Sequence, residues 1–129
     1  MGIESGIVAR LNAVVSVTSL VGNRIYADTM TDGADNPAIV YKLISTTPFS
    51  ALNGDTGKYR SVIQLGLIAD TKPEIIQLSE AVVSALQRYK GAVSDITILD
   101  SKLDNIFDEE FDITTNQTAR VVEFSIIFE

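Results

Sequence analysis

The chain has 129 residues and a formal net charge of -7, from 17 acidic and 10 basic residues. It contains no cysteine and no histidine, which excludes disulfides, thiolate metal sites and any Ser-His-Asp or Cys-His catalytic arrangement within this chain. The acidic balance argues against nucleic-acid binding, because contacts to phosphate require clustered lysines and arginines.

The length is that of one ordinary domain, and we expect a single domain over residues 1–129. Apolar residues make up 46% of the chain and charged residues 21%, close to the average for folded domains. No apolar run approaches the roughly 20 residues that a membrane-spanning helix requires. The start carries no basic region before its apolar stretch, so it does not resemble a signal peptide. We therefore expect a protein that is made in the cytoplasm and has no membrane partner.

The first predicted element is a helix whose apolar residues share one face. These residues recur at the spacing of a helical stripe: Ile7, Val8, Leu11, Val14 and Val15. A second short helical turn follows, with Val17, Leu20 and Val21, and Gly22 ends it at a C-cap position. We expect all eight apolar side chains to pack in the core.

Residues 28–36 have the composition of a loop, and Pro37 then opens a strand predicted over residues 38–46. Residues 47–58 contain Pro48, Asn53-Gly54 and Thr56-Gly57, all of which are turn signals, so we expect a long connection there. Phe49 and Leu52 are apolar side chains within this polar stretch. They either fold back onto the domain or dock on another subunit.

The next strand is predicted over residues 59–69 and is apolar on both faces, which indicates a central strand or one covered by another chain. Gly66 within it marks a bulge or a close backbone approach. An amphipathic helix is predicted over residues 73–90. It begins at the capping pair Thr71 and Glu74, and it ends before Gly91.

Two further strands are predicted, over residues 95–104 and 119–128, joined by an acidic connection over residues 104–112. The element order is therefore α-β-β-α-β-β. We expect an α+β fold with a mostly antiparallel four-stranded sheet and two helices packed on one face.

The acidic connection is the strongest candidate for chemistry, since hard cations bind clustered carboxylates. Its spacing does not match a calcium-binding loop, and Lys102 is the only basic residue near it for a phosphate substrate. The stretch Gly54-Asp55-Thr56-Gly57-Lys58 fails as a phosphate-binding loop, because Leu52 replaces the first glycine and Tyr59 replaces the Mg²⁺-binding Ser or Thr. We expect no enzyme, and no catalytic, cofactor-binding or metal residues. A metal-dependent hydrolase that uses the acidic cluster is a disfavoured alternative.

The ordered set of segments resembles the tail completion, or tail terminator, family of siphophages, which includes tail-to-head joining proteins. The resemblance covers nearly the whole chain. It rests on Leu20-Val21-Gly22-Asn23-Arg24-Ile25-Tyr26, Pro37-Ala38-Ile39-Val40-Tyr41, Leu52-Asn53-Gly54-Asp55-Thr56-Gly57, Ala81-Val82-Val83-Ser84-Ala85-Leu86 and Arg120-Val121-Val122-Glu123-Phe124.

The resemblance implies a structural virion protein at the head-proximal end of the tail. It implies a homo-oligomeric ring, usually a hexamer, that caps the tail tube protein and docks it to the head connector or stopper protein. DNA would pass through the lumen without specific binding. Alternatives are a head-side adaptor or stopper, a minor tail tube subunit, and a plain cytosolic binding module.

Two groups of residues are candidates for this role. We expect a contact with a neighbouring subunit or the tail tube from residues of the turn-rich stretch, namely Phe49, Leu52, Asn53 and Asp55. We expect acidic residues at the lumen or its rim, namely Asp104, Asp108, Glu109, Glu110 and Asp112, together with the acidic stretch 28–35. Six copies at -7 each would carry a formal charge of -42.

Overall fold

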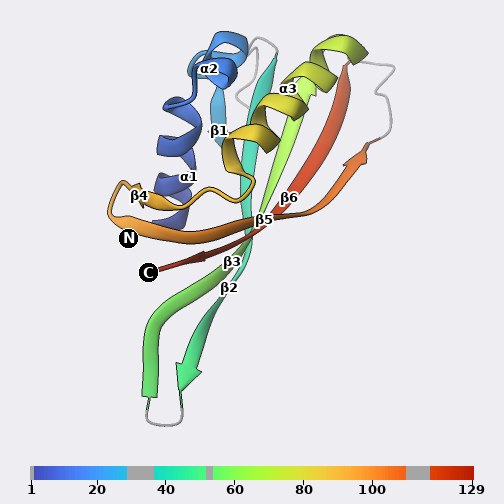
Figure 1. Ribbon diagram of the computed structural model, residues 1–129. Coiled ribbons are helices and arrows are strands. Elements are labelled where there is room, and N and C mark those ends of the chain that lie inside the picture. Colours follow the sequence, from blue (N-terminus) through green and yellow to red (C-terminus); the bar gives the residue numbers. More distant parts are fainter. Residues whose placement is uncertain (1, 29–36, 52–53, 110–116) are drawn as a thin grey trace.

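The computed structural model describes residues 2–28, 37–51, 54–109 and 117–129. The described residues form three helices and six strands (Figure 1). In chain order these are α1 Ile3–Asn12, α2 Val15–Val21, β1 Ile25–Ala27, β2 Ala38–Ala51, β3 Gly54–Ala69, α3 Lys72–Leu86, β4 Gly91–Val93, β5 Ile96–Asp108 and β6 Thr118–Phe128. The strands form one sheet in the order β1-β2-β3-β6-β5-β4. Only β1 and β2 are parallel among these pairs.

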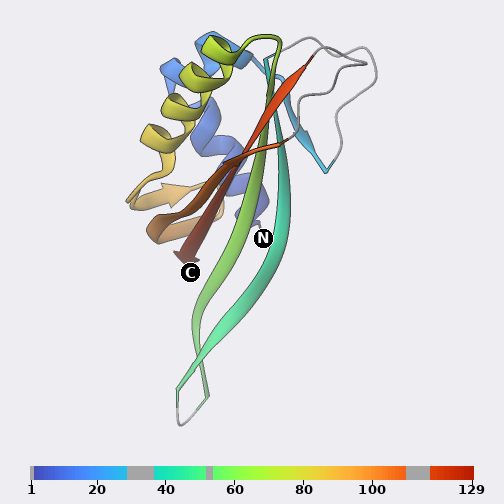
Figure 2. The same cartoon turned by 90° about the vertical axis from the view of Figure 1, so that its right-hand side faces the viewer.

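The three helices lie on one face of the sheet, and within the described ranges no helix lies on the other face (Figure 2). The α+β class, the mostly antiparallel sheet and the placement of helices on one face are thus confirmed. The predicted counts of four strands and two helices are wrong. Strands β1 and β4 were missed because each has three residues, too few for an alternating pattern to be visible.

The core lies between the helices and the facing side of the sheet. Alternate residues of β3 and β6 point into it and are almost fully buried, namely Ile63, Leu65, Leu67, Val122, Phe124 and Ile126. The helices supply the opposing layer, with Ile7, Leu11, Ile75, Leu78 and Val82. Each such side chain contributes about 1.5–3 kcal/mol through removal of its surface from water.

Six of the eight residues of the N-terminal stripe lie in the core or pack against it, and Val15 does not. Four of its eight residues are fully buried, namely Ile7, Leu11, Val17 and Val21. Val15, however, is 78% exposed. The chain breaks at Val14, which is extended, and α2 restarts with its axis bent by 89° from that of α1, so the single stripe does not continue. Gly22 caps α2 at a φ of 59°, as predicted.

The described segments contain no single helix that is long and apolar enough to cross a membrane. The pair α1 and α2 meets the test of length and composition only when the two are taken together across their bend.

Strand β3 is central, between β2 and β6, which is one of the two predicted alternatives. Gly66 is not at a bulge, because it pairs regularly with Val40 on one side and Val121 on the other. The register shifts lie elsewhere, between Leu43 and Ser45 in β2 and between Leu103 and Asn105 in β5.

Helix α3 begins as predicted. The Thr71 hydroxyl accepts a hydrogen bond from the Glu74 N–H at 3.4 Å and donates one to Glu74 Oε1 at 3.1 Å. The helix ends at Leu86, earlier than predicted, because the next residues are held by β5. The Arg88 N–H donates to the Ser101 carbonyl at 2.6 Å, and Gln87 Oε1 accepts from the Leu103 N–H at 2.7 Å.

The long connection predicted over residues 47–58 is wrong. Strands β2 and β3 continue through it as a two-stranded ribbon that projects beyond the rest of the molecule (Figure 1). Among the described residues of this stretch, the ladder is irregular at a register shift between Pro48 and Ser50. Likewise, β5 continues to Asp108, into the stretch predicted as an acidic connection.

Candidate assembly surfaces

The projecting ribbon, residues 47–51 and 54–58, is called the arm below. Strand β6 pairs with β3 only from Tyr59 to Ala69, so the arm loses the support of the sheet at that point. Within it, Ser50 pairs with Asp55 and Ala51 with Gly54. Gly54 and Gly57 adopt positive φ values of 131° and 77°, a region that side chains disfavour. The arm is thus a lone hairpin held by its own backbone ladder.

The root of the arm is fixed to the body by residues at the C-terminal end of β6. The Tyr59 ring stacks on Phe128, with centroids 5.6 Å apart, and Phe128 is itself fully buried. Lys58 Nζ lies 3.5 Å from Glu129 Oε2. The direction in which the arm leaves the sheet is therefore set by the core.

Phe49 lies on the arm and is half-buried. Its carbonyl accepts a hydrogen bond from the Thr56 hydroxyl at 3.0 Å, and the Arg60 guanidinium lies 5.5 Å from the centre of its ring. A hollow of about 120 Å³ is lined by Thr47, Pro48, Phe49 and Arg60. Of the other residues expected to make contacts, Asp55 belongs to β3, whereas Leu52 and Asn53 lie outside the described residues.

The face of the sheet opposite the helices is called the bare face. Its side chains alternate with those of the core and form rows across the strands. One row is polar and runs through Lys42, Gln64, Glu123 and Asn105, with Gln64 Nε2 donating to Glu123 Oε1 at 3.1 Å. The next row is apolar and runs through Val40, Gly66, Val121 and Phe107. The bare face is therefore a mixed surface and not a second core.

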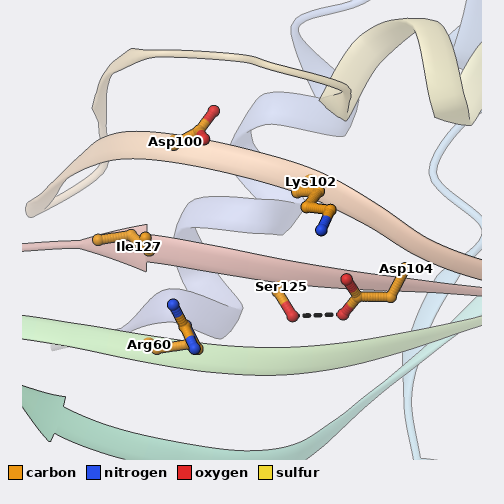
Figure 3. A pocket seen from close by; sticks show the side chains of 6 residues that line it. All are labelled: Arg60, Asp100, Lys102, Asp104, Ser125 and Ile127. Atoms are coloured by element: carbon orange, nitrogen blue, oxygen red, sulfur yellow. Dashed lines mark hydrogen bonds between the residues drawn. The ribbon is translucent and has the colours of Figure 1, made fainter.

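A pocket of about 300 Å³ opens on the bare face (Figure 3). It is lined by Arg60, Asp100, Lys102, Asp104, Ser125 and Ile127. The Ser125 hydroxyl donates a short hydrogen bond to the Asp104 carboxylate. Asp100 pairs instead with Arg88 across the edge of β5, at 2.7 Å. The pocket holds charges of both signs and presents no histidine or cysteine.

The predicted acidic group is divided between the two faces. Asp104 lies on the bare face, whereas Asp108 lies on the helix-bearing side, where Arg120 Nε at 2.6 Å and Lys72 Nζ at 2.5 Å donate to its carboxylate. These hydrogen bonds, that from Arg120 first, lower the pKa of Asp108 to about 2. Glu109 is exposed and its N–H donates to the Ala119 carbonyl. Glu110 and Asp112 lie outside the described residues.

No cluster of three or more potential metal ligands occurs in the parts of the chain that the structure describes. What the described geometry offers is contact surface: a lone arm, a mixed bare face and an acidic strand end. Sequence reasoning missed the exposed apolar side chains Ile106 and Phe107, which lie at that strand end and are 40% and 39% exposed. The sequence did contain a signal for them, because they form an apolar pair inside an acidic stretch.

The fold has a counterpart among solved structures. The structure is similar to a chain in a solved structure described as the virion of a native gene transfer agent (GTA) particle. The TM-score is 0.71 and the sequence identity 15%, and the match covers 98% of this chain and 94% of that chain. At that sequence identity, the similarity shows that the two chains share a fold and carries no further conclusion.

The sequence matches the model of the family described as Tail completion protein gp17 over residues 5–129, and the chain belongs to this family. It is therefore a structural protein of the virion tail and not an enzyme, and it works in contact with other tail or head proteins. No curated protein matches the sequence significantly.

Proposed function

We propose that this protein assembles as a ring, a hexamer, that caps the finished tail tube and joins the tail to the head connector. Its partners are copies of itself, the tail tube protein on one side, and the head connector or stopper protein on the other. DNA passes through the lumen of the ring without specific binding. Membership of the tail completion family supports the tail role, and the surfaces described above support the assembly.

The arm is the observation that carries this proposal. An isolated two-stranded ribbon is marginally stable in water, and its open edges tend to pair with other chains. Here the ribbon continues past the last support from β6, with exposed side chains at Pro48, Thr56 and Lys58. Because such an extension is only marginally stable by itself, we expect a partner to cover it. We assign that contact to Phe49, Leu52, Asn53 and Asp55, against a neighbouring subunit or the tail tube.

The charge of the chain supports the passage of DNA without retention. Phosphate contacts by lysine and arginine would hold DNA in a salt-dependent way, whereas an acidic lumen repels it. Residues Asp104, Asp108, Glu109, Glu110 and Asp112 are proposed to face the lumen or its rim. Asp104 and Glu109 fit this role best, because Asp108 is neutralised by two cations.

The solution mass tests the proposal. Light scattering over a concentration series, with negative-stain images of any large species, is expected to give a ring of about six subunits with an open centre. The same measurement with purified tail tubes tests whether the tube triggers assembly. A protein that stays monomeric alone and also fails to bind tubes would overturn the proposal. Rings that associate with heads but not with tails would assign the protein to the head-side adaptors.

A further inference from the structure

The two sides of the sheet end in strand edges that are only partly covered. Strand β1 pairs with β2 at Ile39 to Tyr41 alone, so the outer edge of β2 from Lys42 onward meets no strand among the described residues. At the other side, β4 pairs with β5 only at Ile96 to Ile98, and the segment after α3 bonds the backbone at Ser101.

Leu103 is the last residue of β5 that the segment after α3 reaches, through the Gln87 side chain. From Asp104 to Asp108 the outer edge of β5 meets no further strand in the described ranges. We call residues 42–51 the β2 edge and residues 104–108 the β5 edge. Open edges of this kind present rows of unpaired N–H and C=O groups that pair readily with another strand.

Exposed apolar side chains concentrate at these two edges. Five large apolar side chains are exposed in the described part of the chain. Three of them lie on the edges: Ile44 on the β2 edge at 49%, and Ile106 and Phe107 on the β5 edge. A fourth, Ile76, lies one turn along α3 from Lys72, which bonds Asp108 at the end of the β5 edge. Natural edges usually carry charges that prevent pairing, so apolar side chains here indicate that a partner covers them.

The charges of the two edges are complementary. Residues 42–60 contain Lys42, Lys58 and Arg60 against one acid, Asp55. Residues 104–112 contain five acids and no basic residue. Neither Asp104 nor Glu109 pairs with a cation among the described residues, and Asp104 bonds only Ser125. Among the described residues, one of these three cations meets a carboxylate in its own copy, namely Lys58 at 3.5 Å from Glu129 Oε2, and the acidic segment keeps carboxylates that meet no cation.

We infer that the β2 edge of one copy pairs with the β5 edge of the next copy, so that the sheet continues from subunit to subunit. This inference rests on the proposed ring. The occupant is a second copy because each copy carries both complementary edges, on opposite sides of the same sheet. A contact between two different patches repeats from copy to copy and closes into a ring. Main-chain hydrogen bonds supply the affinity, and the alternating side chains set the register.

Disulfide trapping tests the pairing directly, because the chain has no native cysteine. Ser45 and Asn105 both lie on the bare face, and strand pairing keeps them on one face of the continuous sheet. We combine Ser45→Cys or Thr47→Cys with Asn105→Cys or Phe107→Cys, which scans the register. At least one pair is expected to give an oxidised ladder that ends at the copy number of the ring. Each single-cysteine variant is expected to stay uncrosslinked.

Substitution of Ile44 gives an independent test. Ile44→Asp places a carboxylate against the acidic β5 edge and is expected to lower the assembled fraction at least tenfold. Ile44→Lys, which keeps charge attraction, is expected to lower it less. Val15→Asp is the matched control, because Val15 is the most exposed of the five apolar side chains and lies on α2, away from both edges. It is expected to leave assembly unchanged.

The outcomes separate this inference from the ring itself. Rings that form in the wild type but give no ladder with any of the four pairs, or that persist in Ile44→Asp, overturn the edge pairing and leave the ring intact. Dimers trapped by a single cysteine also overturn it, because they require like patches to meet. A wild type that forms no ring, with or without tail tubes, overturns the proposed function instead.

Discussion

The two halves of strand β3 form one continuous strand but lie in opposite environments. From Tyr59 to Ala69 the strand is flanked by β2 and β6, and its core-facing side chains are buried under the helices. From Gly54 to Lys58 it pairs with β2 alone, and its described side chains are exposed. Residues 59–69 stabilise the fold through buried side chains, whereas residues 54–58 extend with no described side chain buried in the core. Stability and assembly are therefore assigned to different lengths of the same strand, and the following predictions test that division.

The largest expected effect is on assembly. Replacement of residues 49–58 by an Asn-Gly turn joins Pro48 to Tyr59, which are partners in the β2–β3 ladder, through a favoured hairpin connection. We expect the shortened protein to lose ring formation and tube capping completely, as seen by light scattering and tail-joining assays. Its thermal midpoint should stay within a few degrees of that of the full chain, since the core is untouched. Loss of folding in this variant would contradict the division between arm and body.

Truncation of a core aromatic should have the largest effect on stability. Phe124 is fully buried in β6, so Phe124→Ala is expected to lower the free energy of unfolding by about 3–5 kcal/mol. Phe49→Ala, on the half-buried arm, is expected to cost less than about 1 kcal/mol. Denaturant unfolding of the two variants measures the difference between their losses in free energy of unfolding. The slope of the transition is the control. Equal losses would place Phe49 in the core.

A substitution at the root of the arm is expected to have an effect on stability between those of Phe124→Ala and Phe49→Ala. Tyr59 stacks on buried Phe128 at 5.6 Å between ring centroids. Tyr59→Ala should lower the free energy of unfolding by about 1–2 kcal/mol, because it removes both the stacking and part of the buried area. Tyr59→Phe retains the ring and is expected to be nearly neutral. A Tyr59→Ala variant of unchanged stability would mean that the arm is not anchored through this pair.

The cap of α3 is a local feature of the body. Thr71→Ala removes the hydroxyl that accepts the Glu74 N–H, and is expected to cost about 1 kcal/mol in unfolding experiments. Ser84→Ala, at an exposed position within the same helix, is the control and should be neutral or slightly stabilising. Assembly by the arm is expected to be unaffected in both variants.

The smallest effect concerns acid stability. The pKa of Asp108 is about 2 in the folded protein, below the usual value of 3.8 for an aspartate, so its ion pairs stabilise the fold above about pH 4. That contribution is lost as the pH falls from about 4 to about 2. Because the side chain is exposed to solvent, the expected size is under about 1 kcal/mol. Asp108→Asn should reduce this part of the pH dependence, while Glu109→Gln should not.

The predicted elements differ in how well the sequence determined them. The stripe of α3 and its cap at Thr71 were predicted well, because both depend on residues within one or two turns of each other. The end of α3 was not, because Arg88 and Gln87 are held by Ser101 and Leu103, which are distant in sequence. Phe49 is half-buried on the arm and Asp104 is exposed, and the sequence could not say that Asp104 and Asp108 lie on opposite sides of the sheet. A register shift between Leu103 and Asn105 separates them.

What the sequence alone determined is the order of the main elements, the core-facing period of its helices and strands, and the absence of histidine and cysteine. These features follow from local spacing and from residue types, which can be read from the sequence without knowledge of the fold. The tertiary structure decided that residues 47–51 and 54–58 form an arm and not a loop, and that the β2 and β5 edges meet no further strand among the described residues. Both depend on where β1, β4 and β6 stop pairing, since a strand edge is covered or free only relative to strands that are remote in the chain.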